Sequence, residues 1–113
     1  MIREDYIMRL VERFTKSMKR ILGLKEQDKV EDTINAIGET YRNLLGLDSS
    51  IVHSLSTEDI LYLMDYEGRL NSYKCQILAN LLREEGDIYL AAGNTEIATR
   101  ISFYSISYQR RPL

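Results

Sequence analysis

The sequence predicts an all-α protein of five to six helices, and three observations support this fold class. The only proline among the 113 residues is Pro112, so residues 1–111 can be helical almost throughout. Apolar residues recur at intervals of three and four, which places them on one side of a helix. The alternation of apolar and polar residues that is typical of strands is not sustained anywhere.

The first helix is predicted to be amphipathic and to end at Gly23, because glycine adopts the left-handed conformation of a helix C-terminus without steric cost. Its apolar arc is expected to comprise Ile7, Leu10, Val11, Phe14, Met18, Ile21 and Leu22. A stripe of basic residues lies opposite this arc, within about 60° on the helical wheel: Arg9, Arg13, Lys16 and Arg20.

A second helix is predicted to end at Gly46. Its inward positions are Val30, Ile34, Ile37, Tyr41, Leu44 and Leu45. Three acids, Asp28, Glu31 and Asp32, are expected in its first turn, where they suit the positive end of the helix dipole. Both predicted stops have leucine after glycine, which fits a Schellman ending.

Residues 48–70 predict two short helices. Asp48 is the expected cap of the first, which carries Ile51 and Val52. Ser56 is the expected N-cap of the second, with Asp59 in the capping-box position and an end near Glu67-Gly68. The apolar residues expected to be buried in the second helix are Ile60, Leu61, Leu63 and Met64.

Two longer helices are predicted to follow. Asn71 is a candidate cap, preceded by Leu70 as a hydrophobic staple, for a helix running from Ser72 to about Ala92. Its inward residues are Cys75, Leu78, Leu81, Leu82, Ile88 and Tyr89. The Gly93-Asn94 pair breaks it. The final helix is expected to carry Ile97, Ala98, Ile101, Tyr104, Ser105 and Tyr108 on one side. A single continuous core is expected to include Phe14, Ile34, Leu44, Leu78, Leu82, Tyr89 and Ile101.

Residues 79–112 resemble one tetratricopeptide (TPR) repeat. The pattern of large, Leu-Gly, aromatic and small residues is matched by Leu82, Glu85-Gly86, Tyr89 and Ala98, with Gly93 in the turn. The chain departs from the pattern where Leu82 replaces tryptophan and Glu85 replaces leucine, and also at Ser102 and Arg110. The resemblance implies a helical hairpin in which Gly86 and Ala98 allow close approach and Tyr89 fills the adjacent groove.

Residues 14–47 resemble a second, more degenerate copy, so the sequence suggests TPR-like hairpins separated by an inserted helical segment. The whole chain also resembles a family of uncharacterised short bacterial proteins that begin Met-Ile-Arg-Glu-Asp-Tyr. The shared features include the Leu-Gly-Leu phrase, Ser56–Asp59 and the Glu84–Tyr89 stretch. That resemblance implies a TPR-like fold and no established activity.

Composition and charge favour one globular domain over residues 1–113. The hydrophobic share of 44% and the charged share of 28% are typical of folded proteins. Residues 1–25 carry seven basic and three acidic residues (+4), residues 26–96 carry five and fourteen (−9), and residues 97–113 carry three and none (+3). This uneven distribution suggests complementary contacts within or between chains.

No catalytic residue, metal site or cofactor is expected. His53 is the only histidine and Cys75 the only cysteine, whereas zinc usually takes three or four protein ligands. His53 is interpreted as a polar residue on a short helix and Cys75 as a buried, unreactive thiol. The acids Glu84, Glu85 and Asp87 are interpreted as a solvated or partner-facing patch.

The leading functional hypothesis is a non-catalytic interaction module that binds a protein or peptide, or forms a homodimer. Its candidate surfaces are the basic stripe and an exposed aromatic group of Tyr104 and Tyr108 near Phe103. The alternative is a basic-helix adaptor for nucleic acid or an anionic membrane surface, which the overall acidic charge disfavours. The absence of a long apolar run predicts no transmembrane segment and a cytoplasmic protein.

Overall fold

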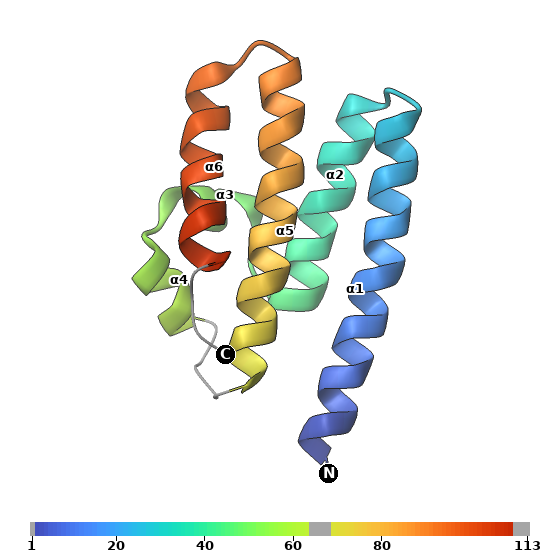
Figure 1. Ribbon diagram of the computed structural model, residues 1–113, viewed down its shortest axis with the longest axis vertical. Helices are drawn as coiled ribbons and strands as arrows, with labels where there is room; N and C mark the ends of the chain where they lie inside the picture. Colours follow the sequence, from blue (N-terminus) through green and yellow to red (C-terminus); the bar gives the residue numbers. More distant parts are fainter. Residues whose placement is uncertain (1, 64–68, 110–113) are drawn as a thin grey trace. The chain divides into compact units, whose positions relative to one another are not determined.

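The computed structural model describes residues 2–63 and 69–109, and within these ranges the chain is all-α (Figure 1). The elements are α1 (Ile2–Glu26), α2 (Val30–Thr40), the π-helical turn η1 (Tyr41–Leu45), α3 (Ser49–Ser54), α4 (Thr57–Leu63), α5 (Arg69–Ala91) and α6 (Thr95–Gln109). The predicted fold class is therefore confirmed. The chain divides into an N-terminal unit, residues 1–49, and a C-terminal unit, residues 50–113.

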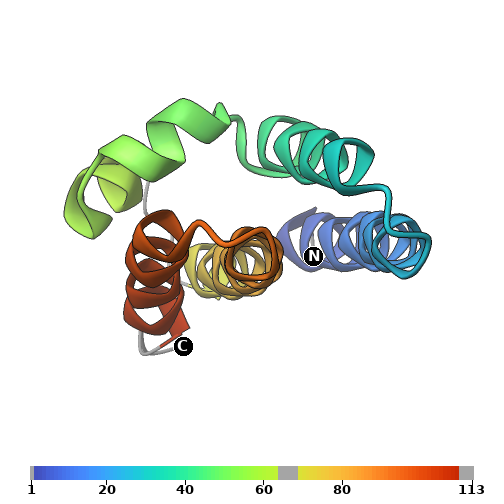
Figure 2. The ribbon, with the colours of Figure 1, turned by 90° about the horizontal axis from the view of Figure 1, so that it is seen from above.

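The N-terminal unit is built on the antiparallel hairpin of α1 and α2 (Figures 1 and 2). Ile7, Leu10 and Ile21 of α1 are buried, as their spacing predicts. The predicted arc is wrong at one margin, because Val11 and Leu22 are 41% and 42% exposed. Both lie at the same margin on the helical wheel, and the predicted arc is wider than the surface that the fold covers.

The first helix continues past Gly23, so the predicted stop is wrong. The residue with a left-handed backbone is Asp28, at φ 58°. The amides of Asp28 and Lys29 donate to the carbonyls of Lys25 and Leu24, each at 3.1 Å, which is the Schellman pattern. Asparagine and aspartate tolerate this conformation better than most residues.

The start of α2 also differs from the prediction. Lys29 occupies the N-cap position, so Asp28 precedes the helix, while Glu31 and Asp32 remain in its first turn. Val30 is 50% exposed, and the side chains of Ile34 and Phe14 are half-buried, whereas all three were expected inside. Hydrophobic burial in this hairpin therefore begins further along α2.

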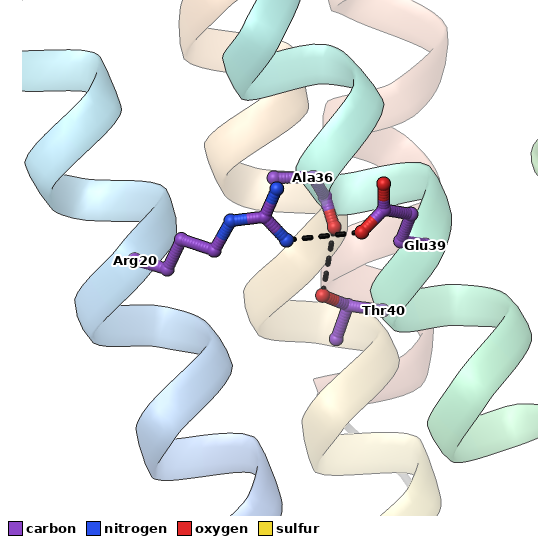
Figure 3. A network of polar contacts seen from close by, with 4 residues as sticks. All are labelled: Arg20, Ala36, Glu39 and Thr40. Carbon is purple, nitrogen blue, oxygen red and sulfur yellow. Dashed lines mark hydrogen bonds and ion pairs between the residues drawn. The ribbon is translucent and has the colours of Figure 1, made fainter.

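The end of α2 widens into η1 and stops at Gly46, as predicted. Gly46 has φ 69°, and its amide donates to the Arg42 carbonyl at 3.0 Å. Thr40 precedes the wider turn, and its hydroxyl donates to the Ala36 carbonyl at 2.8 Å (Figure 3). Gly38 has a steric role that the sequence did not indicate, since a Cβ there would lie 3.1 Å from the Ser49 hydroxyl oxygen.

In the C-terminal unit, the predicted cap of α4 is confirmed. The Asp59 amide donates to the Ser56 hydroxyl oxygen at 3.2 Å. Val52 of α3 and Ile60 of α4 are fully buried. The predicted helix end at Glu67-Gly68, together with Met64, lies outside the described residues, as do the side chains of Leu61 and Leu63.

The longest element of this unit, α5, starts at Arg69, so Asn71 lies inside the helix and is not its cap. The chain is already helical at the two residues before Asn71, and an N-cap must have a non-helical backbone. Burial of the predicted inward side is confirmed for five positions: Cys75, Leu78, Leu81, Leu82 and Ile88. Tyr89 is half-buried and does not belong to the fully buried core.

The turn between α5 and α6 forms at Gly93-Asn94, as predicted. Gly93 has φ 86°, and the Asn94 amide donates to the Tyr89 carbonyl at 2.9 Å. The Asn94 side chain then caps α6 by accepting from the Ile97 amide at 3.4 Å. The two helices pack as an antiparallel pair (Figures 1 and 2), with Ala98 and Ile101 buried.

A membrane-spanning helix would need a longer and more apolar stretch than any helix offers among the described residues.

Candidate functional site

The predicted basic stripe forms a cationic edge along α1, defined as Arg9, Arg13, Lys16 and Arg20. Two of its members are held within the N-terminal unit. Arg13 Nη2 donates to the Asn43 carbonyl at 3.1 Å, and Arg20 Nη1 lies 2.9 Å from Glu39 Oε2 (Figure 3). The side chains of Arg13, Arg20 and Glu39 are all exposed, so each of the two contacts stabilises the fold by less than about 1 kcal/mol.

The other two cations, Arg9 and Lys16, are exposed to solvent. Arg9 and Arg13 also line a shallow hollow of about 130 Å³ together with Tyr6 and Leu10. Of these four residues, Tyr6 is 50% exposed, whereas Leu10 is buried. A hollow of this kind can accept a small apolar or anionic side chain.

A second exposed strip of α1 is apolar. This apolar edge consists of Met8, Val11 and Leu22, which are 62%, 41% and 42% exposed. Because Val11 and Leu22 were expected in the core, their exposure is a feature that sequence periodicity missed. The same helix thus offers solvent both a cationic edge and an apolar edge.

A buried polar pair lies in the C-terminal unit. His53 Nε2 of α3 is 2.9 Å from Glu85 Oε1 of α5, and their side chains are 23% and 1% exposed. The predicted acidic patch is therefore wrong, since Glu84 is also buried and, of the three acids, only Asp87 is exposed. Glu85 follows Leu81 and Leu82 by four and three residues, which places it on the buried side of α5.

The position of Glu85 on this apolar stripe was a usable signal for its burial. Its partner was not predictable, because His53 lies 32 residues away in the sequence. An ionised Glu85 would accept a hydrogen bond from His53 Nε2, so the carboxylate orients the imidazole ring. The pair links α3 to α5.

Tyr89 lies one helical turn after Glu85. Burial raises the pKa of the Tyr89 hydroxyl above its ordinary value of about 10, and the negative charge of Glu85 raises it further. Both effects favour the neutral phenol. Cys75, in contrast, is a fully buried thiol, as expected.

The residues that carry the TPR resemblance lie on α5, α6 and the turn between them. Leu82, Gly86 and Ala98 are buried, Gly93 has the left-handed backbone, and Tyr89 is half-buried. The predicted aromatic surface is not seen at Tyr104, whose side chain is half-buried. The side chains of Phe103 and Tyr108 lie outside the described part of the structure.

Comparisons of the chain with protein-family models, with curated proteins and with solved structures found no match.

Proposed function

We propose that this protein is a non-catalytic helical interaction module that binds a protein or peptide partner, or a second copy of itself, through the solvent side of α1. The observation that supports this proposal is that α1 exposes both the apolar edge (Met8, Val11, Leu22) and the cationic edge. Exposed apolar side chains supply area to be buried on binding, while adjacent charges select the partner and its orientation.

A protein partner agrees better with the cationic edge than nucleic acid does. Arg13 and Arg20 are directed to Asn43 and Glu39 of the same unit, which reduces the number of cations available for phosphates. Binding to nucleic acid depends on neutralising several phosphates at once. An acidic protein segment needs only one or two cations beside an apolar anchor.

The proposal includes two further expectations from the sequence. Residues 79–112 form a TPR-like hairpin, which the burial of Gly86 and Ala98 supports, and the protein acts in the cytoplasm of a bacterium. In TPR-like proteins the hairpins act as scaffolds that present helix sides to partners.

The direct test compares partner capture by the wild-type chain and by charge-reversed variants. A photo-crosslinking residue in place of Tyr6 reports on partners at the hollow. We expect the Arg9→Glu/Lys16→Glu double variant to lose the crosslinked partner. The matched control is Arg83→Glu/Arg100→Glu, which makes the same change of charge at exposed positions of α5 and α6.

A salt titration separates the partner classes. A protein partner anchored on the apolar edge should keep most of its affinity as salt increases, whereas nucleic acid or anionic vesicles would show a steep loss. Equal capture by both double variants would contradict the proposed surface. A steep salt dependence with RNA, DNA or anionic vesicles would replace the proposal with the adaptor function.

A further inference from the structure

We infer that the hollow on α1 is a binding site for one glutamate or aspartate side chain of a protein partner. The residues that line the hollow in the described part of the chain are Tyr6, Arg9, Leu10 and Arg13, which include two guanidinium groups and no carboxylate. This charge selects an anionic group. The inference rests on the proposed function and deepens it, because it names the group that α1 recognises on its partner.

Arg13 is already oriented for such a group. Its Nη2 atom donates to the Asn43 carbonyl at 3.1 Å, and this contact ties the guanidinium to the end of η1. A guanidinium has five N–H donors, so donors remain for a carboxylate after this contact is made. A side chain that is held in place before binding loses less conformational entropy when the ligand arrives.

Arg9 supplies the second guanidinium of the hollow. It precedes Arg13 by four residues, so the two side chains leave the helix about 40° apart. Arg9 is exposed, and no hydrogen bond or ion pair joins it to another described residue. A planar carboxylate can accept hydrogen bonds from both guanidinium groups, and such charge-assisted bonds are stronger than neutral ones.

The apolar part of the hollow suits the methylene groups of an acidic side chain. Leu10 is 3% exposed and Tyr6 is 50% exposed, so both offer carbon atoms beside the two arginines. The volume of about 130 Å³ equals that of roughly four water molecules at about 30 Å³ each, which is enough for a carboxylate and its neighbouring methylene groups. Inorganic phosphate has no apolar part to contact Leu10 and Tyr6.

Two acids of α1, Asp5 and Glu12, lie within one helical turn of Arg9 and are exposed. At 100° per residue they are about 140° and 160° from Leu10, on the far side of Arg9. Neither lines the hollow. Their charges lower the positive potential at Arg9, so we expect an isolated acidic side chain to bind with a dissociation constant in roughly the millimolar range.

Two acids on the other side of the hairpin have cationic partners outside the hollow. Glu39 Oε2 lies 2.9 Å from Arg20 Nη1, and Asp48 Oδ1 lies 3.7 Å from Arg42 Nε. These pairs leave the two arginines of the hollow for a carboxylate from another chain.

An NMR titration of the ¹⁵N-labelled full chain tests the site directly. The probe is glutamate blocked at both its amino and its carboxyl terminus, added at constant ionic strength. It should shift the Nε–Hε signals of Arg9 and Arg13. Blocked glutamine, which has the same shape without the charge, should leave these signals unchanged.

Arg9→Gln/Arg13→Gln should weaken the binding of blocked glutamate roughly fivefold. The matched control is Lys16→Gln/Lys19→Gln, which removes the same charge from exposed positions of α1 that do not line the hollow. It should weaken binding less than about twofold. Circular dichroism checks that each variant is folded. If the change at Arg13 disturbs the fold, Arg9→Gln alone should still weaken binding more than Lys16→Gln does.

Three outcomes would overturn the site. Equal weakening in the two double variants would show that the overall positive potential of α1 attracts the probe. Equal binding of blocked glutamine would exclude recognition of the carboxylate. Tighter binding of inorganic phosphate than of blocked glutamate at the same ionic strength would exclude an acidic side chain as the preferred ligand.

The failure of this inference can be told apart from the failure of the proposed function. If blocked glutamate does not bind but a partner is crosslinked at position 6, this inference fails and the proposed function is supported. If blocked glutamate binds at Arg9 and Arg13 but no partner is captured, the site is supported and the proposed function is contradicted.

Discussion

Glu85 shows how a single buried carboxylate depends on a residue far away in the sequence. Its side chain is 1% exposed and is hydrogen-bonded to His53. A buried charged group without a partner is costly, so His53 and Glu85 should be energetically coupled. This coupling is a property of the two side chains and not of either helix alone.

We expect Glu85→Ala to lower the free energy of unfolding by about 1–3 kcal/mol. His53→Ala should cost clearly less in the Glu85→Ala background than in the wild type, because the hydrogen bond is then already absent. Urea unfolding of the wild type, both single variants and the double variant measures this coupling. Glu12→Ala, at an exposed carboxylate, is the control and should change the value by about 0.5 kcal/mol or less. Additive effects of His53→Ala and Glu85→Ala would contradict the coupling.

Tyr89 should make the fold sensitive to alkaline pH. Its pKa is raised in the folded state, so its stabilising contribution is complete below the unfolded-state pKa of about 10 and is lost as the pH rises through the folded-state pKa. Tyr89→Phe should therefore lose less stability than the wild type between neutral pH and pH values above 10. Urea unfolding at both pH values measures the difference.

The control for this prediction is Tyr62→Phe, which alters a ring that is 79% exposed. It should lose as much stability at alkaline pH as the wild type does. Identical losses in Tyr89→Phe and the wild type would show that Tyr89 does not contribute to the alkaline transition.

At the scale of the element, two glycines that look alike in the sequence have opposite roles. Both stand in a Leu-Gly-Leu phrase, but Gly23 lies within α1, whereas Gly46 ends η1 with φ 69°. An added Cβ would meet nothing within 4 Å at either position, so backbone conformation alone should decide the effect of a substitution.

We expect Gly23→Ala to raise the free energy of unfolding by about 0.5–1 kcal/mol, because alanine is the better helix former. Gly46→Ala should lower it by about 1–2 kcal/mol, because a residue with a Cβ is strained in the left-handed region. Thermal or urea unfolding of the two variants measures both changes. A loss of stability in Gly23→Ala would contradict a helical backbone at Gly23 and would support the helix end that the sequence predicts there.

The packing of α5 against α6 gives a second prediction at this scale. Gly86 and Ala98 are buried small residues on the two helices. If they permit a close TPR-like approach, Gly86→Leu and Ala98→Leu should each destabilise the fold by about 1–3 kcal/mol through overpacking. The double variant should be non-additive because both changes enlarge one contact.

Thr99→Leu serves as the control for these variants, since it enlarges an exposed position next to Ala98. Its effect should stay within about 0.5 kcal/mol. A higher melting temperature for Gly86→Leu would remove the TPR assignment, because helix propensity would then outweigh any steric cost.

At the scale of the whole molecule, the question is whether the two compact units unfold together. The sequence predicts one domain over residues 1–113, and a single domain of this size normally unfolds in one transition. Leu82 is fully buried in the C-terminal unit, so Leu82→Ala should lower the free energy of unfolding by about 2–5 kcal/mol.

Hydrogen exchange should therefore show the same loss of protection in the slowest amides of α1 and α2 as in those of α5. Unchanged protection in α1 and α2 would contradict the single-domain prediction and identify residues 1–49 as an independent folding unit.

Local sequence determined most of the helices and several of their ends. Apolar spacing predicted the buried positions Leu10, Ile37 and Leu82, because helix periodicity arises from hydrogen bonds between residues four apart. The ends at Gly46 and Gly93 and the cap at Ser56 were predictable for the same reason, since each depends on its own few neighbours.

The tertiary structure decided which margin of each apolar stripe is covered and which distant side chains meet. Val11 and Leu22 have the spacing of core residues but are exposed. The sequence of their own helix does not determine how much of its apolar arc the neighbouring elements cover. The His53–Glu85 pair could not be predicted either, because residues 32 positions apart meet only through the packing of α3 and α5. The candidate site thus depends on which side chains other elements cover, and contacts between residues far apart in the sequence decide this. The helices that carry the site form through contacts between residues close together in the sequence.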